Sequence, residues 1–240
     1  MNSNKSPRLK HQPKGVELLY EDDDVLVINK PCGLLTMGTD RDKSRTAHSI
    51  LNDYVRKGNS KSRNRIYIVH RLDRDTSGIL IFAKSEKAKL ILQEQWQNSE
   101  KKYLTVVYGE LTPKEGVIST YLAENNAFSV YSTQDATKGK LSHTAYKVLK
   151  EAKGFSLLEI RLLTGRKHQI RVHLAEKGHP VVGDKKYGKA GDGYYCLALH
   201  AKSLSCTHPI NGKQLFLETA IPDYFSRLIG RIGIGKEESP

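Results

Sequence analysis

The sequence predicts an α+β fold with a mixed β-sheet, for three reasons. Many short segments are rich in Val, Ile, Tyr and Thr and alternate apolar with polar residues, as strands do. Few segments have the spacing of an amphipathic helix, and they interrupt runs of strands, which argues against a regular βαβ repeat. No internal repeat or low-complexity linker divides the 240 residues, so we expect one domain with a sizeable core.

The first half of the chain is expected to open with a hairpin. Two apolar runs flank the acidic group Glu21-Asp22-Asp23-Asp24, and Asp favours turns. A metal site is the alternative, but three successive carboxylates point in divergent directions, so we favour the turn. Helical spacing and the cap residue Ser85 indicate two helices further on. The expected strands are residues 16–20, 25–28, 66–69 and 79–83, and the expected helices are residues 46–55 and 86–98.

The second half is expected to consist mostly of strands. The segment 102–108 alternates and is rich in Tyr, Thr and Val. A helix over residues 166–177 is stopped by Gly178 and Pro180, and Pro222 opens a last short helix. The expected strands are residues 102–108, 116–122, 128–132, 144–149, 155–163, 197–204 and 214–220.

A candidate nucleophile lies between the strands expected at residues 66–69 and 79–83. In the segment His70-Arg71-Leu72-Asp73-Arg74-Asp75-Thr76-Ser77-Gly78, Asp73 stands between two arginines, whose charge favours the ionised, nucleophilic carboxylate. Flanking strands would fix the backbone while the turn leaves the carboxylate open to a ligand. A surface turn with solvated charges is the alternative, and this segment alone does not decide. Asp75 is chemically equal, but its turn-forming neighbours favour a structural role.

The charge of the chain favours a polyanionic partner. It has 39 Lys and Arg against 26 Asp and Glu, a formal net charge of +13. Each phosphate that these side chains neutralise releases counterions, which gives sequence-independent affinity for nucleic acid. A ribosomal or membrane-surface protein would share this excess. The segment 56–65, with five Lys or Arg, is expected to be a mobile loop, for which RNA contact and simple solvation are equally well supported.

The cysteines and apolar segments exclude other classes of protein. Three Cys without a Cys-x-x-Cys pair indicate neither a disulfide framework nor a structural zinc site. No apolar run approaches the roughly 18 residues that cross a bilayer, so we expect a cytoplasmic protein without a membrane partner. Residues 1–14, with four Lys or Arg and two Pro, are expected to be a disordered basic leader, residues 15–230 a catalytic domain, and residues 231–240 a tail.

Four segments, taken together and in this order, resemble the RluA-type RNA pseudouridine synthases. The first segment is 20–31, which ends in Lys30-Pro31, the second is 70–80 around Asp73, and the third is Lys102-Tyr103-Leu104. The fourth begins with Gly165-Arg166-Lys167-His168-Gln169-Ile170-Arg171 and continues through Gly178-His179-Pro180, Gly183-Asp184 and Leu199-His200-Ala201. The resemblance runs from about residue 17 to about residue 225. It implies the pseudouridine synthase catalytic fold, a long mixed and mainly antiparallel sheet with flanking helices and a basic active-site cleft. It also implies isomerisation of specific uridines in structured RNA, ribosomal or transfer.

The resemblance further implies the roles of individual residues. Asp73 matches the family's catalytic aspartate, Arg171 the arginine that pairs with it, and Tyr103 a tyrosine that can stack on a flipped uracil and act as acid or base. Arg71 resembles the arginine that fills the gap left in the RNA stack. The other substrate-binding residues implied are Lys30, Arg166, His168 and Gln169, with Lys30 contributing more to the floor of the site than to chemistry.

The implied reaction needs one carboxylate in a pocket that keeps water away, and no cofactor. The target base must be extruded from the stack, which costs least in loops, so a stem-loop RNA is the expected partner. A catalytic metal is not expected. His168 and His173 are five residues apart, a His-Glu-x-x-His motif is absent, and no acidic cluster accompanies them.

Two other classes of function stay open at this point. A non-catalytic RNA chaperone of the same fold would keep the basic surface but would not need Asp73, Tyr103 and Arg171 together. An RNA hydrolase would need metal ligands or a water-activating base, and neither set is evident. We expect a monomer without an obligate protein partner. About sixteen residues precede the first motif, so target choice is expected to depend on the catalytic domain and its loops.

Overall fold

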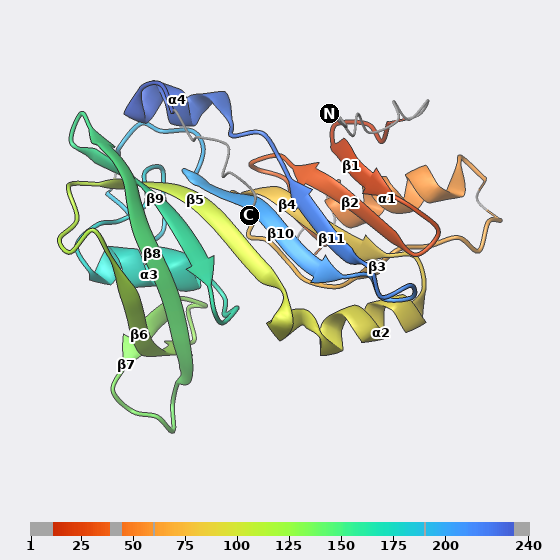
Figure 1. Cartoon of the computed structure of the whole chain (residues 1–240), viewed down its shortest axis with the longest axis horizontal. Helices are drawn as coiled ribbons and strands as arrows, with labels where there is room; N and C mark the ends of the chain where they lie inside the picture. The colour runs from red at the N-terminus through yellow and green to blue at the C-terminus, as the bar shows by residue number, and fades with distance from the viewer. Residues whose placement is uncertain (1–11, 39–44, 60, 190, 233–240) are drawn as a thin grey trace.

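The structure is a computed structural model that describes residues 12–38, 45–59, 61–189 and 191–232. Within these residues it confirms the predicted α+β fold, with eleven strands in one sheet and four α-helices beside it (Figure 1). The expected basic leader and tail lie outside the described residues, except at their inner ends. Residues 12–14, which we assigned to the leader, form a turn before the first strand, and Gln12 Oε1 accepts a hydrogen bond from the Leu18 amide.

The elements follow the predicted ones closely. The strands are β1 (Glu17–Glu21), β2 (Val25–Lys30), β3 (Tyr67–Ile68), β4 (Ser77–Ala83), β5 (Glu100–Tyr108), β6 (Glu115–Glu124), β7 (Val130–Thr133), β8 (Lys140–Ala152), β9 (Phe155–Leu162), β10 (Leu199–Thr207) and β11 (Gln214–Glu218). The helices are α1 (Ala47–Arg56), α2 (Glu86–Glu94), α3 (Gln169–Glu176) and α4 (Asp223–Ile229), with a 3-10 turn η1 (Trp96–Asn98). The strand order is β1-β2-β4-β10-β5-β9-β8-β6-β7, with β3 paired to β4 and β11 to β10.

Strands β2 and β4 are buried on both faces. Residues 79–83 of β4 alternate between two apolar cores, one on each side of the sheet. Helix α1 covers one core with Leu51, and α2 covers the other with Leu92. A capping box of Thr46 and Ser49 begins α1, and the Ser85 hydroxyl caps α2 as predicted. Cover on both faces explains why β4 is apolar throughout and does not alternate.

Strands β4 and β10 form the one parallel pair among the described strand pairs. Ala201 of β10 lies opposite Gly78 on one side and Tyr103 of β5 on the other. Gly78 has φ +108, and a Cβ on it would lie 2.3 Å from the Ala201 carbonyl oxygen. A residue without a side chain is therefore required for β4 and β10 to meet. This contact brings the segment that carries Asp73 beside the strand that carries Tyr103.

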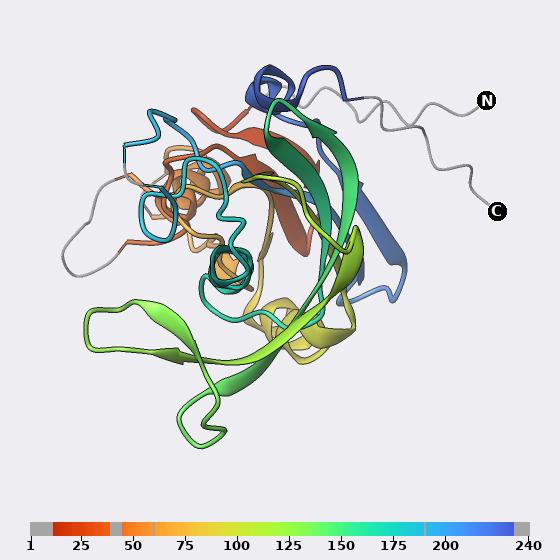
Figure 2. The same cartoon turned by 90° about the vertical axis from the view of Figure 1, so that its left-hand side faces the viewer.

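The second half of the sheet curves around α3 (Figure 2). Helix α3 packs against β6, β7 and β8, and α4 packs on β5, β8 and β9. Buried hydrogen bonds join α3 to the strands, since the two ring nitrogens of His173 bond the hydroxyls of Thr144 and Thr120 at 2.9 and 3.0 Å. Burial lowers the pKa of His173 to about 4, so the imidazole is neutral at physiological pH. None of the helices in the described ranges is long and apolar enough to cross a bilayer.

The acidic segment 21–24 forms the predicted turn between β1 and β2. Asp22 Oδ1 accepts hydrogen bonds from the amides of Asp24 and Val25, as in an Asx turn. Its Oδ2 accepts from the Tyr20 hydroxyl and lies 3.0 Å from His208 Nε2. Asp22, Asp24 and His208 form the one group of three potential metal ligands in the described part of the chain. None of them lines the pocket described below.

Gly78 and Gly154 offer a matched test of the β4–β10 contact. Both have positive φ, but a Cβ on Gly154 would meet nothing within 4 Å. We expect Gly154→Ala to cost about 1 kcal/mol of unfolding free energy, the penalty of a left-handed backbone. Gly78→Ala should cost at least about 3 kcal/mol, because it also forces the two strands apart. Urea unfolding measures both, and equal losses would show that the close contact contributes nothing.

Candidate active site

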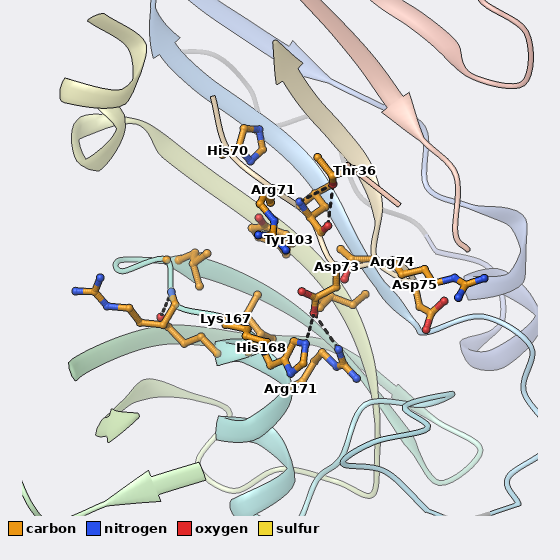
Figure 3. A pocket seen from close by; sticks show the side chains of 18 of the residues that line it. Thr36, His70, Arg71, Asp73, Arg74, Asp75, Tyr103, Lys167, His168 and Arg171 are labelled. Atoms are coloured by element: carbon orange, nitrogen blue, oxygen red, sulfur yellow. Dashed lines mark hydrogen bonds and ion pairs between the residues drawn. The ribbon is translucent and has the colours of Figure 1, made fainter. Parts of the chain in front are cut away.

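One open pocket of about 830 Å³ gathers most of the residues singled out in the sequence. It lies where the segment before β4 meets β5 and the N-terminal end of α3 (Figure 3). The predicted site residues that line it are Arg71, Asp73, Tyr103, Arg166, His168, Gln169 and Arg171. Segments far apart in the sequence therefore meet in one cavity, as the four ordered motifs suggested.

The segment 69–76 carries Asp73 and is held by its neighbours. Strand β3 is only two residues long, so this connection is longer than the sharp turn we predicted. His70 Nε2 accepts a hydrogen bond from the Ile81 amide, and the Thr36 hydroxyl bonds both the amide and the carbonyl of Leu72. Burial lowers the pKa of His70 to about 3, which keeps the ring neutral and able to accept. These bonds fix the backbone on the N-terminal side of Asp73.

Lys30 fixes the backbone on the other side of Asp73 and does not line the pocket. Its side chain is fully buried, and Nζ donates to the carbonyls of Pro31, Leu34 and Arg74 at 3.1, 2.7 and 2.9 Å. Burial lowers the pKa of Lys30 to about 8. All three ammonium protons are used within the protein, which leaves Lys30 no N–H for the predicted contact with substrate and fits the expected position at the floor of the site.

Asp73, Arg171 and Asp184 form an ionic network in which Arg171 and Asp184 are buried and Asp73 is partly exposed. Arg171 Nη1 donates to Asp73 Oδ2 at 2.9 Å, as the resemblance implied. The other edge of the guanidinium makes a bidentate pair with Asp184, with Nε and Nη2 each 2.8 Å from a carboxylate oxygen. Burial opposes the charge on Arg171, but Asp184 first and Asp73 second outweigh it and raise the pKa of the guanidinium. The result is a cation held in one orientation, with a single N–H directed at Asp73.

Asp184 had no predicted role, although Gly183-Asp184 was part of the matched motif. Its side chain is completely buried, and Oδ1 also accepts from the amides of Lys186 and Tyr187. Burial would raise the pKa of Asp184, but the hydrogen bonds and charge of Arg171 lower it. The sequence offered one signal for the role of Asp184, the need of a buried Arg171 for a partner carboxylate. Arg171 lies 13 residues earlier in the chain.

Helix α3 begins three residues later than predicted, at Gln169 and not at residue 166. His168 has φ +52, so it cannot continue the helix, and the segment before it is a loop. This loop places His168 Nε2 3.8 Å from Asp73 Oδ2. The Tyr187 hydroxyl accepts from the Val130 amide and lies 2.8 Å from His168 Nδ1. Tyr187 and Nδ1 therefore share a hydrogen bond, which leaves Nε2 as the ring nitrogen that faces Asp73. Burial lowers the pKa of His168, although Asp73 opposes the shift.

The structure does not support direct substrate binding by Gln169. The side chain is buried, and its Oε1 accepts from the Thr164 hydroxyl and the Arg166 amide. Its Nε2 donates to the His143 carbonyl and the Thr144 hydroxyl. The amide group is thus saturated by the protein, and Gln169 positions the loop ahead of α3.

The arginines that flank Asp73 in the sequence are not the cations that contact it. Arg74 Nε donates to the Gly33 carbonyl, and Figure 3 shows Arg74 and Asp75 extending away from Arg171 and His168. Asp73 instead meets Arg171, 98 residues later in the chain. Our expectation that a neighbouring arginine is the partner of Asp73 is therefore corrected, because the backbone turn directs Arg74 to the Gly33 carbonyl.

Tyr103 and a row of cations complete the pocket. The Tyr103 side chain is nearly buried, and burial, with a smaller contribution from Asp73, raises the pKa of its phenol, which keeps it protonated. Arg71 and Arg166 line the same cavity. Further cations in the lining are Lys101, Lys167, Lys185 and Lys186. The cleft is therefore basic, as predicted, and its lining also contains the carboxylates of Asp73 and Asp75 and one neutral phenol.

The pocket brings together an arginine-bound carboxylate, a tyrosine and several cations, and comparison with known proteins identifies the family. Residues 24–176 match the family model described as RNA pseudouridylate synthase. A protein of Nitrosomonas europaea named ribosomal large subunit pseudouridine synthase D is 37% identical over 238 residues, covering 92% of this chain and 67% of that protein. An uncharacterized RNA pseudouridine synthase of Mycoplasma genitalium is 37% identical over 216 residues. The match covers 88% of this chain and 68% of that protein.

Solved structures show the same fold. The structure named human RNA pseudouridylate synthase domain containing 4 superposes on this chain with a TM-score of 0.74 at 24% identity. The match covers 87% of this chain and 90% of that chain. The human RNA pseudouridylate synthase domain containing 1 gives 0.71 at 25% identity, with 88% and 85% coverage. The chain belongs to the RNA pseudouridine synthase family, as its motifs predicted, and it is an isomerase that acts on RNA.

The ionic network predicts a specific defect for Asp184→Asn. An amide in place of the carboxylate presents N–H groups to the guanidinium, so Arg171 loses its fixed orientation and Asp73 with it. We expect kcat to fall roughly 100-fold with KM nearly unchanged, since Asp184 is buried away from RNA. Asp192→Asn is the matched control, because Asp192 accepts from the Gly183 amide in the same loop without touching Arg171. Equal rates for the two variants would contradict this role.

Proposed function

We propose that this protein converts selected uridines in stem-loops of ribosomal RNA to pseudouridine, with Asp73 as the catalytic carboxylate and no cofactor. The observation that carries the proposal is the Asp73 carboxylate, fixed by Arg171 at 2.9 Å in an open basic pocket. Action as a monomer is part of the proposal. A cytoplasmic location is part of the proposal, as is the absence of an obligate protein partner.

Asp73 starts the reaction by adding to the sugar or to the base, or by removing a sugar proton, so that the bond between C1′ of the ribose and N1 of uracil breaks and N1 keeps the electron pair. The freed base turns within the pocket, C5 bonds to C1′, the C5 proton leaves, and N1 gains a proton, so atoms and charge balance. Arg171 holds Asp73 in position, and the neutral Tyr103 phenol offers a flat ring for the base and a proton donor or acceptor. Because the pocket is open, bound RNA would have to cover it to keep bulk water from these steps.

The target base must leave the RNA stack before Asp73 can reach it, because the reacting atoms are otherwise inside the helix. Arg71 lines the pocket two residues before Asp73, and its planar cation suits the gap that the base leaves. Ribosomal RNA is favoured over transfer RNA by relatives named for the large ribosomal subunit, which are 34–37% identical to this chain.

Asp73→Asn should abolish isomerisation and leave RNA affinity within about threefold, because the basic surface persists and only the reactive carboxylate is lost. Release of tritium from carbon-5-labelled uridine in ribosomal RNA transcripts measures the activity. Asp75→Asn is the control, since Asp75 is chemically equal and points away from Arg171 (Figure 3). Substantial turnover by Asp73→Asn would remove Asp73 from catalysis. RNA binding without turnover by the unaltered protein would favour a chaperone instead.

Arg71→Lys and Arg171→Lys should impair different steps, because Lys keeps the charge but loses the planar fork. Arg71→Lys should slow turnover on a stacked stem-loop more than on an RNA whose target uridine is already splayed out. Arg171→Lys should slow both RNAs equally, since a misoriented carboxylate is poor for any substrate. Single-turnover rates on the two RNAs test this, and the same ratio for both variants would mean that Arg71 does not assist base flipping.

A further inference from the structure

We propose that the turn between β6 and β7 binds a second nucleotide of the RNA, whose base stacks on the exposed ring of Phe128. This subsite deepens the proposed function and rests on it. It would hold an unpaired base outside the catalytic pocket while the target uridine is inside. Phe128 is exposed, hydrogen bonds fix its turn, and further contacts join this turn to residues of the active-site lining.

Phe128 is presented to solvent by a backbone that is fixed locally. Its side chain is 64% exposed, and its φ of +56 lies in the left-handed region that a bulky residue rarely adopts. The carboxamide oxygen of Asn125 accepts from the amides of Ala127 and Ser129, and the Asn125 carbonyl accepts from the Phe128 amide at 2.9 Å. Local hydrogen bonds thus hold a large apolar ring in water, where it gains nothing from folding.

Two lysines of the active-site lining hold the same turn. Lys186 Nζ donates to the Phe128 carbonyl at 2.7 Å, and Lys167 Nζ lies 3.5 Å from that oxygen. Lys167 Nζ is also 5.5 Å from the centre of the Phe128 ring and pairs with Glu124. Both lysines line the pocket that contains Asp73. The aromatic ring therefore stands beside cations at the mouth of the active site.

A third connection runs from the turn to Asp73 itself. The amide of Val130, two residues after Phe128, donates to the Tyr187 hydroxyl at 3.0 Å. Tyr187 bonds His168, whose Nε2 is 3.8 Å from Asp73, and the Tyr187 ring lies 5.2 Å from the Arg171 guanidinium. The position of the Phe128 ring relative to Asp73 is thereby set by short contacts, which a subsite for a nucleotide near the target requires.

An exposed aromatic ring with one lysine beside it and a second lysine on its backbone carbonyl is suited to single-stranded RNA. Every base has a flat face that can stack, and the lysines can meet phosphates on either side of it. A protein partner would be expected to use a larger apolar patch, with fewer cations at its centre. Phe216 on β11 is 79% exposed but does not line the pocket, so it serves as a matched control.

The test is the affinity of an Asp73→Asn protein for a fluorescein-labelled RNA hairpin with a uridine-rich loop, measured by anisotropy. We expect Phe128→Ala and Phe128→Leu each to raise Kd roughly tenfold, because both remove the stacking face. Phe128→Tyr should stay within about twofold of the parent, because it keeps the ring. Phe216→Ala should have no effect. The dependence of Kd on salt should not change in any of them, since no cation is lost.

Equal Kd values for Phe128→Ala and Phe216→Ala would overturn the subsite. A Kd for Phe128→Leu equal to that of the parent protein would also overturn it, because it would indicate a general apolar contact of the kind a protein partner makes. The proposed function is tested separately, by pseudouridine formation in the chain with an intact Asp73. If the intact chain forms pseudouridine but the Phe128 variants bind RNA with an unchanged Kd, the subsite alone is refuted. If the Phe128 variants change Kd as expected but the chain with an intact Asp73 forms no pseudouridine, the proposed isomerase function is refuted and the RNA subsite remains supported.

Discussion

The shared guanidinium of Arg171 is the interaction on which the rest of the site depends. It carries one positive charge between two carboxylates, and Asp184, not Asp73, takes the bidentate edge. A network of this kind adds little net stability, because desolvation offsets the attraction, but removal of one member leaves a buried charge uncompensated, at a cost of about 3–5 kcal/mol. Its value lies in geometry, since Arg171 can neither rotate nor leave without breaking three hydrogen bonds. Asp73 therefore has one orientation before RNA arrives.

The fold serves this geometry by bringing together three segments that lie far apart in the chain. Asp73 comes from the connection between β3 and β4, Arg171 from α3, and Asp184 from the segment between α3 and β10. The parallel contact of β4 with β10, possible only at a glycine, sets the first of these beside β5 and Tyr103. Hydrogen bonds of His173 fix α3 to β6 and β8, and so fix Arg171.

Much of this could be predicted from the sequence, and the failures have physical causes. Strand and helix positions follow from local hydrophobic spacing and capping residues, and the ordered motifs identified Asp73, Tyr103 and Arg171. The sequence could not show that Lys30 and Gln169 are saturated by backbone and hydroxyl groups, because those partners lie up to 44 residues away. It assigned the charge partner of Asp73 to neighbouring arginines, whereas the turn directs Arg74 to Gly33. The late start of α3 depends on the left-handed His168, which helical spacing does not reveal.

If the shared guanidinium controls the catalytic carboxylate, Asp184 acts on Asp73 only through Arg171, and a double-mutant cycle can test this claim. Single-turnover rates of pseudouridine formation would be measured for Asp184→Asn, Arg171→Lys and the double variant on one RNA. If the claim is right, Asp184→Asn has no further effect once Arg171 is replaced, and the double variant is only as slow as the slower single one. If the two losses multiply, Asp184 acts by another route and the shared guanidinium does not control the catalytic carboxylate.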